Sequence, residues 1–343
     1  PKPGIFRVEE GRRFHNDVNV KYLLPNDDEE LDRLHLQHYM MRYIWNSNYN
    51  APVDDLLQKE DAKVLDLGCG AGSWLFELAT EFPSVSFTGM DISPVIPSTI
   101  KPRNISFVRG NVLEGLPFDD NTFDFVHQRF LVAAIPLNDW QNLVNELVRV
   151  LKPGGYLELM EMDVEFKPLG PSAKLLDDAF IKVMIENGQD PHIITKLRSF
   201  METNGQLEDI VREEKFGPYD KSAGRLSQLA IENHKLGFTA LKATLIKVLN
   251  ISSEEYDELI QAMTIELSEY KTFNHTGFVN RNALYEAPGH GDTVFGKLKL
   301  DLKKASSLFV IFEKQVKEPV KNFSNISKRK GYLYGNPKVS EDK

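Results

Sequence analysis

The stretch KVLDLGCGAG, residues 63–72, decides the fold that we expect for this chain. Val64, Leu65 and Leu67 predict a short buried strand, and three glycines follow at alternate positions before a helical run over Ser73–Glu81. Because glycine has no Cβ atom, a ligand can lie against this backbone, and the free N–H groups that open the helix favour a carboxylate or phosphate. The stretch therefore predicts a strand, a glycine loop and a helix beside a nucleotide-like ligand.

The spacing of the glycines indicates which class of ligand this loop holds. The pattern is GxGxG, whereas a dinucleotide-binding loop has GxGxxG, and its third glycine would stand where this chain has Ser73. The spacing and the acidic Asp66 before the first glycine disfavour a nicotinamide oxidoreductase. A glycine loop alone also occurs as a plain turn, so the downstream residues have to support a binding site.

Composition describes an ordinary globular protein. The 343 residues are 41% hydrophobic and 27% charged, which allows one large domain or two smaller ones, and no apolar run reaches membrane-spanning length. Cys69 is the only cysteine, so an internal disulfide and a cysteine-rich zinc site are excluded. We therefore expect a soluble protein of the cytoplasm, or of the nucleus, with no metal site.

Charge is distributed unevenly along the chain. The net charge is −9, but residues 296–343 hold twelve Lys or Arg against five Asp or Glu, which leaves −16 on the remainder. An acidic body repels phosphates, which disfavours a nucleic-acid partner unless the basic segment supplies the contact, and no membrane partner is expected. The basic segment is more simply a solvated, partly flexible tail.

Strands and helices are predicted to alternate through the first half of the chain. Apolar strands are expected at 85–90, 105–108, 122–126 and 156–160, and the intervening segments include a helix with an apolar face that Asn138 caps and a Lys-Pro-Gly-Gly turn ends. This alternation predicts a parallel sheet with right-handed crossovers, whose ligands bind at the carboxyl edge of the strands. Five residues follow strands at that edge: Gly68, Asp91, Asn111, His127 and Glu161.

Two of the predicted elements lie outside this alternating core. Asp27 and Glu30 have the spacing of a capping box, followed by an apolar helical face that includes His38, which we interpret as a core residue. Segments 162–205 and 222–272 are expected to be mostly helical, with a strand over Leu207–Phe216 between them. A last antiparallel strand is expected at 293–299 or at 308–314.

Five ordered motifs then resemble those of class I S-adenosylmethionine-dependent methyltransferases: VLDLGCGAG, TGMDIS, GNVLEGLPF, FDFVHQRF and ELVRVLKPGGYLEL. Three segments are similar to the sequences of fungal methyltransferases of the secondary-metabolism regulator type: GRRFHN, YLLPNDDEELDRLHLQHY and LPFDDNTFDFVHQRF. The resemblance covers about residues 10–272. It implies an α/β fold with a doubly wound, Rossmann-like, seven-stranded and mostly parallel sheet, and helical insertions that build the acceptor side.

The resemblance also implies residues that bind S-adenosyl-L-methionine. Asp66 is expected beside the amino-acid end of this cofactor. Asp91 is expected on the ribose hydroxyls, since a carboxylate accepts two hydrogen bonds. Asn111 stands where the class often has an acid on the adenine amino group, and His127 is a candidate base facing the methyl group. The expected cofactor-binding set is Tyr22, Asp66, Gly68, Cys69, Gly70, Gly72, Asp91, Ile92, Asn111, Val112, Gln128 and Arg129. Phe14, Tyr22 and Trp74 are candidates for contact with the sulfonium.

The domain division expected from these features has four parts. Residues 1–60 form an N-terminal helical lead-in and cap, 61–162 the cofactor-binding core, 163–300 the rest of the sheet with the acceptor-side helices, and 301–343 a basic C-terminal segment. The predicted function is in-line transfer of a methyl group to a small-molecule or protein acceptor. The alternative is a methyltransferase-like regulatory protein that binds the cofactor and acts through a protein partner.

Overall fold

The computed structural model describes residues 6–16, 22–93, 101–219, 224–270 and 272–283. All of these belong to one compact unit, residues 1–286, and a second unit comprises residues 287–343. The predicted basic tail and both segments expected to supply the last strand lie outside the described residues. The elements in chain order are β1 (Phe6–Glu9), β2 (Arg12–His15), α1 (Asp28–Trp45), α2 (Asp54–Leu57), β3 (Lys63–Leu67), α3 (Ser73–Glu81), β4 (Ser86–Asp91), β5 (Ile105–Arg109), η1 (Val112–Glu114), β6 (Phe123–Arg129), η2 (Leu137–Asp139), α4 (Trp140–Val150), β7 (Leu151–Met162), α5 (Pro171–Glu186), η3 (Ile193–Thr195), α6 (Leu197–Asn204), β8 (Leu207–Pro218), α7 (Arg225–Ala240), α8 (Lys242–Leu249), α9 (Ser253–Glu269) and β9 (Phe273–Ala283).

A seven-stranded sheet forms the centre of this unit, in the order β5-β4-β3-β6-β7-β9-β8. The first five strands of that order pair in parallel, and β9 runs antiparallel to both of its neighbours. The predicted Rossmann-like α/β fold is therefore confirmed. The strand order reverses at β3, which has β4 on one side and β6 on the other. Ligands of such sheets bind at the carboxyl ends of the strands beside this reversal.

Alternating side chains of β3 pack on opposite faces of the sheet. Val64 packs in a cluster with Trp74 and Leu75 of α3, whereas Leu65 and Leu67 join the cluster that contains the apolar face of α4. Both faces of β3 are buried because helices cover them, and this explains why the strand reads as an almost continuous apolar run. The helix predicted over Ser73–Glu81 has those bounds in the structure.

The last strand of the sheet lies earlier in the chain than the sequence predicted. Phe273–Ala283 forms β9 between β7 and β8, and neither of the two segments expected further along fills that place. Its buried positions include Asn274, Thr276 and Asn280, so the strand lacks the apolar alternation by which strands are recognised. Asn274 donates to the carbonyl oxygen of Asp163 at 2.7 Å, which satisfies one of these buried amides.

Three further boundaries differ from the sequence-based expectation. β1 and β2 pair as a hairpin in the segment expected to be an irregular or helical lead-in. β6 continues to Arg129, because it stays paired with β7, and so includes His127 instead of ending before it. Asn138 lies in η2 and does not cap α4, whose N-cap is Asp139 without a side-chain hydrogen bond.

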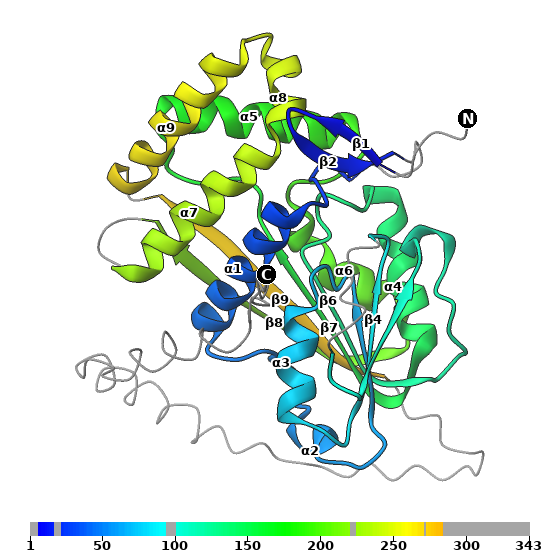
Figure 1. The fold of residues 1–343 in the computed structure, drawn as a ribbon. Coiled ribbons are helices and arrows are strands. Elements are labelled where there is room, and N and C mark those ends of the chain that lie inside the picture. The colour runs from blue at the N-terminus through cyan, green and yellow to red at the C-terminus, as the bar shows by residue number, and fades with distance from the viewer. Residues whose placement is uncertain (1–5, 17–21, 94–100, 220–223, 271, 284–343) are drawn as a thin grey trace, which may run out of the picture. The chain divides into compact units, whose positions relative to one another are not determined.

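Helices α5, α7, α8 and α9 gather beyond one end of the sheet, with α1 between them and the sheet in the view of Figure 1. They share a buried cluster with the central sheet, which contains Leu176 of α5, Phe238 of α7 and Met263 of α9 together with Trp45 of α1 and Phe278 of β9. A capping box formed by Ser252 and Glu255 is present at the start of α9. The expected helical insertions are thus observed, whereas the four-part division of the chain stays a prediction.

Candidate functional site

The glycine loop between β3 and α3 is held by backbone hydrogen bonds and by one carboxylate. The N–H of Gly68 donates to the carbonyl oxygen of Met90 at 2.8 Å, which ties the loop to the end of β4. Asp91 follows directly, and its Oδ2 accepts from the N–H of Gly70 at 2.8 Å while its Oδ1 accepts from the N–H of Ser93 at 2.7 Å. Gly70 has a backbone angle φ of +51°, which residues other than glycine rarely adopt.

This loop opens into a cavity of about 290 Å³ at the carboxyl edge of the sheet. Most of the residues expected to bind the cofactor line it, namely Tyr22, Gly68, Cys69, Gly70, Asp91, Ile92, Asn111, Val112 and Arg129. Asp66, Gly72, Gln128 and His127 are not among the lining residues. The structure therefore brings together residues from five separate predicted segments, and it leaves four of the expected ones beneath the surface of the cavity.

The two polar groups expected on the nucleoside keep unused hydrogen-bonding capacity. Each carboxylate oxygen of Asp91 accepts one backbone N–H, and each has a second lone pair. Burial raises the pKa of Asp91, and the backbone donors of Ser93 and Gly70 oppose that shift. Asn111 caps η1 by accepting from the N–H of Leu113 at 3.1 Å, so its oxygen also has one lone pair left.

Arg129 carries a positive charge into the cavity. Its Nη2 donates to Nδ1 of His38 at 3.0 Å, and Nε2 of His38 lies 2.9 Å from a carboxylate oxygen of Glu77. Burial, with the nearby charges of Arg129 and Arg42, lowers the pKa of His38 to about 3, so this imidazole is neutral and accepts from Arg129. Within the described residues, no carboxylate lies at ion-pairing distance from Arg129. Its guanidinium is therefore available to an anionic group of a ligand.

His127 is not where the sequence placed it. Only 1% of the residue is exposed, its Nδ1 lies 2.8 Å from Oδ1 of Asp66, and its ring stacks on that of Trp74 with centroids 4.1 Å apart. The register of the sheet sets His127 opposite Asp66, two residues before the end of β6, where α3 covers it. The cavity is thus lined by neither the candidate base nor Asp66, and Trp74 packs on this pair instead of lining the cavity as expected.

Phe14, also named for the sulfonium, is buried and does not line the cavity either. The guanidinium of Arg7 lies 5.3 Å from the centroid of its ring. Of the three aromatic candidates, only Tyr22 lines the cavity.

Gln128 and Glu161 shape the cavity wall from beneath. The carboxylate of Glu161 accepts from the side chain of Gln128 at 2.7 Å and from the backbone N–H groups of Leu131 and Val132 at 2.7 and 3.1 Å. Burial raises the pKa of Glu161 to about 7, and these three donors limit the shift. Because Leu131 and Val132 line the cavity, Glu161 positions part of its wall without touching a ligand.

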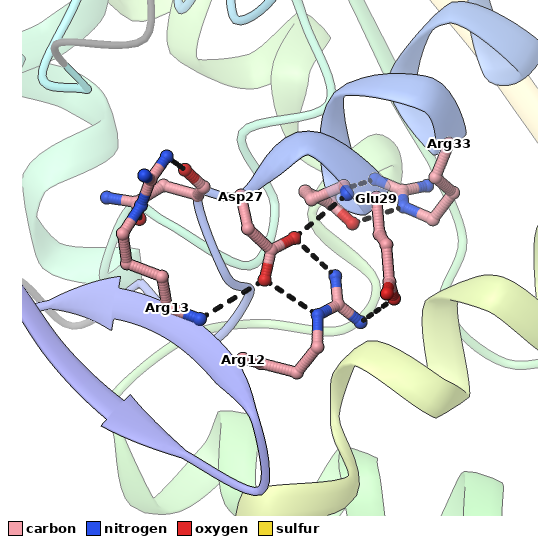
Figure 2. Close-up of polar contacts among 7 residues, drawn as sticks. Arg12, Arg13, Asp27, Glu29 and Arg33 are labelled. Carbon is pink, nitrogen blue, oxygen red and sulfur yellow. Dashed lines mark hydrogen bonds and ion pairs between the residues drawn. The ribbon is translucent and has the colours of Figure 1, made fainter.

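A polar network joins the N-terminal hairpin to the start of α1 (Figure 2). Asp27 accepts two hydrogen bonds of 2.7 Å from the guanidinium of Arg12, one from the N–H of Arg13, and one from the N–H of Glu30 as the helix cap. Glu30 does not complete the expected capping box, because its carboxylate pairs with Arg33 at 2.6 Å. Asp27, Glu30 and Arg33 line the cavity, so this network forms one of its walls.

The side of the cavity away from the sheet consists of residues that the sequence did not single out. Aromatic residues from four segments line it, including Phe166, Phe180, Tyr219 and Phe238, with His234 among them. Phe180 and Phe238 have the spacing of ordinary core residues of a helix, and Phe166 and Tyr219 lie outside helices and strands, so no local signal distinguished them. Arg33 lies 3.4 Å from Oδ1 of Asn233 and connects α1 to α7 across 200 residues of sequence.

Comparison with known proteins shows the family to which the chain belongs. The family model described as "Methyltransferase domain" matches residues 64–155. The Secondary metabolism regulator laeA of Coprinopsis cinerea is 35% identical over 160 residues, which are 46% of this chain and 39% of that protein. Methyltransferase str3 of Strobilurus tenacellus is 31% identical over 197 residues, which are 56% of this chain and 69% of that protein. The chain belongs to the class I S-adenosylmethionine-dependent methyltransferases.

The similarity to these methyltransferases has limits in extent. The chain spans 39% of the length of the laeA regulator and 46% of that of Methyltransferase pytC of Aspergillus terreus, to which it is 34% identical over 158 residues, 46% of this chain. A solved structure, Haemonchus contortus phosphoethanolamine N-methyltransferase 2 in complex with S-adenosyl-L-methionine, is matched over 73% of this chain and 57% of that chain, at 18% identity and a TM-score of 0.44. That likeness is too low to carry an inference about ligands.

The residues of the cavity fit the methyl donor of this family. The loop at Gly70 has no Cβ atom at the cavity wall, and one added there would lie 3.3 Å from Leu34. Among the described residues Arg129 has no carboxylate at ion-pairing distance, and each carboxylate oxygen of Asp91 keeps a free lone pair, so a cation and two acceptors line the cavity. None of the helices in the described part of the chain has the length and hydropathy to span a bilayer.

Proposed function

We propose that this protein binds S-adenosylmethionine at the glycine loop and transfers its methyl group in line to an acceptor held in the same cavity. One observation carries the proposal: a single cavity extends from the glycine loop and Asp91 to the aromatic residues of the helical insertions. A donor site and an acceptor site have to open into one space for direct transfer, because no group of the protein carries the methyl in between.

The proposed donor contacts follow from the free groups of the cavity. Asp91 accepts from the ribose hydroxyls, Asn111 from the adenine amino group, and Arg129 pairs with the carboxylate of the amino-acid end. Gly68, Cys69 and Gly70 admit the donor against their backbone, and Ile92, Val112 and Tyr22 complete the apolar contacts. Asp66, Gly72 and Gln128 support these residues from beneath instead of touching the donor.

The protein contributes alignment and exclusion of water to the reaction. The donor supplies a methyl group already activated by a positively charged sulfur, so the residues need to hold an acceptor atom about 3 to 3.5 Å from it in line. The apolar wall that Glu161 positions, Leu131 and Val132, keeps water out of that space. His127 has no part in proton transfer here, because it is buried against Trp74 and Asp66.

Calorimetric titration with the methyl donor, with S-adenosylhomocysteine and with NAD tests the donor site. We expect the first two to bind and NAD not to bind, and the reverse order would refute the proposal. A screen of small molecules and peptides with a donor labelled in its methyl group then identifies the acceptor. Incorporation of label that Arg129→Met abolishes, while the variant stays folded, is the expected result.

A second candidate is a regulatory protein that binds the cofactor and acts through a protein partner. The similarity to the laeA regulator favours it, since that relative is named for regulation and not for an acceptor. Donor binding without methylation of any molecule in the screen, together with a stable complex with a partner protein, would support this candidate. We place the protein in the cytoplasm or nucleus under either function.

A further inference from the structure

His234 of α7 lines the helical side of the cavity without a hydrogen bond. The residue is 8% exposed, and no hydrogen bond or ion pair to its ring is found among the described residues. Its neighbours are aromatic: the ring centroids of Phe166, Phe238 and Tyr219 lie 4.4, 4.8 and 5.7 Å away. Because the ring lines the cavity, its nitrogens are available to a ligand there.

Tyr219 also presents a polar group to the cavity. The residue is 4% exposed and lines the cavity, and its hydroxyl has no hydrogen-bond partner in the part of the chain that the structure describes. Burial, with the negative charge of Asp177, raises the pKa of this hydroxyl, so it stays protonated and both donates and accepts. Two adjacent side chains therefore present unused hydrogen-bonding groups in an otherwise aromatic part of the cavity.

The charge state of His234 decides what it can bind. Burial lowers its pKa to about 3, so the ring is neutral, with one nitrogen that accepts and one that donates. A neutral imidazole and a phenol do not attract an ionised acceptor. They match an uncharged ligand that has a hydroxyl group, and the surrounding rings match a flat apolar skeleton.

We propose that His234 and Tyr219 select the acceptor, which is an uncharged aromatic small molecule whose hydroxyl hydrogen-bonds to this pair. The inference rests on the proposed function, because it assigns the helical side of the same cavity to the acceptor. Specificity arises because a ligand without the hydroxyl leaves both buried groups unpaired. A protein acceptor is disfavoured, since a peptide segment would bring backbone groups that these rings cannot satisfy.

Binding of 2-naphthol and of naphthalene, which lacks only the hydroxyl, tests this proposal. The protein is saturated with S-adenosylhomocysteine, and the affinity of each probe is measured by fluorescence, with and without that product. We expect 2-naphthol to bind about tenfold more tightly than naphthalene, because one hydrogen bond changes the affinity by roughly that factor. His234→Phe and Tyr219→Phe should each reduce that ratio toward one while the affinity for naphthalene stays within about twofold.

His35→Phe on the exposed surface of α1 is the matched control and should leave the ratio unchanged. Histidines labelled with ¹³C add a second readout, because the ring signal that is lost in His234→Phe should shift when 2-naphthol binds to the parent. If one variant fails to fold, the other carries the test. Equal binding of the two probes, a ratio unaffected by both variants, or no binding of either probe would overturn the proposal. Failure of S-adenosylhomocysteine to bind would refute the donor site instead. The affinities of the two probes measured without that product then test the His234 and Tyr219 pair on their own.

Discussion

Asp91→Ala is the most informative perturbation of the donor site. The carboxylate accepts from Gly70 and Ser93, and we propose that its two remaining lone pairs accept from the ribose hydroxyls. Hydrogen bonds to a charged group contribute about 1.5 to 3 kcal/mol each when the charge is paired, but the raised pKa of Asp91 shows that burial offsets part of this. We therefore expect a total loss of about 1.5 to 3 kcal/mol in donor binding, or about 10- to 100-fold in affinity.

The same change also frees the N–H groups of Gly70 and Ser93, so a loss of folding stability has to be separated from a loss of binding. The assay is calorimetric titration with S-adenosylhomocysteine, accompanied by a denaturation curve. Asp190→Ala is a matched control, because Asp190 accepts from the N–H of His192 at 2.9 Å in a similar turn but does not line the cavity. That control should alter stability and leave donor affinity within about twofold. A folded Asp91→Ala protein with parental donor affinity would refute the ribose assignment.

Three further substitutions test other parts of the argument. Gly70→Val should abolish donor binding, because φ +51° and Leu34 at 3.3 Å from an added Cβ both oppose a side chain; unchanged calorimetric affinity in a folded variant would remove the loop from the site. His127→Gln should lower the free energy of unfolding by about 1 to 3 kcal/mol and leave the pH–rate profile unchanged, and a lost rate inflection near neutral pH would restore His127 as a base. As pH rises from about 4 to about 8, the free energy of unfolding of Asp177→Asn should increase relative to that of the parent, by at most about 1.4 kcal/mol per pH unit. Denaturation curves at several pH values measure this difference.

Burial of Asp177 determines how its ionisation affects the stability of the protein. Burial raises the pKa of this carboxyl to about 8, and its Oδ1 has no hydrogen-bond partner among the described residues. Between its ordinary pKa and about 8, the folded protein holds a proton that the unfolded chain has released, so the stability of the parent falls as pH rises through this interval. A parallel pH dependence of the variant and the parent would show that Asp177 is not buried in this way.

The glycine loop and its contact with Asp91 were predictable from sequence because local residues determine them. Positive φ values require glycine at Gly68, Gly70 and Gly72, and an acid at the end of β4 binds the loop directly. The sequence could not show how far β6 extends, because its last residues are strand only through pairing with β7. Because β6 extends past His127, this residue lies in the core and not at the predicted cavity wall.

Tertiary contacts determine the elements that the sequence missed. β9 is a strand because it completes the sheet between β7 and β8, although Asn274, Thr276 and Asn280 occupy buried positions where apolar residues would be expected. The hairpin of β1 and β2 is held by Arg12 on Asp27, a contact between charged residues that has no periodic signal in the sequence. Propensity and periodicity are weak guides wherever such contacts decide the structure.

The helical side of the cavity exists only after distant elements have docked. Arg33 pairs with Glu30 in α1 and reaches Asn233 in α7, and His234 follows Asn233 directly in the same helix. The contact thus fixes where α7 presents its imidazole relative to the wall that Asp27 and Glu30 form. The glycine loop, by contrast, is complete within residues 63–93. Under the proposed function, changes in α7 therefore alter which acceptor is bound without disturbing the donor site, and relatives that share the motifs of residues 64–155 need not share an acceptor.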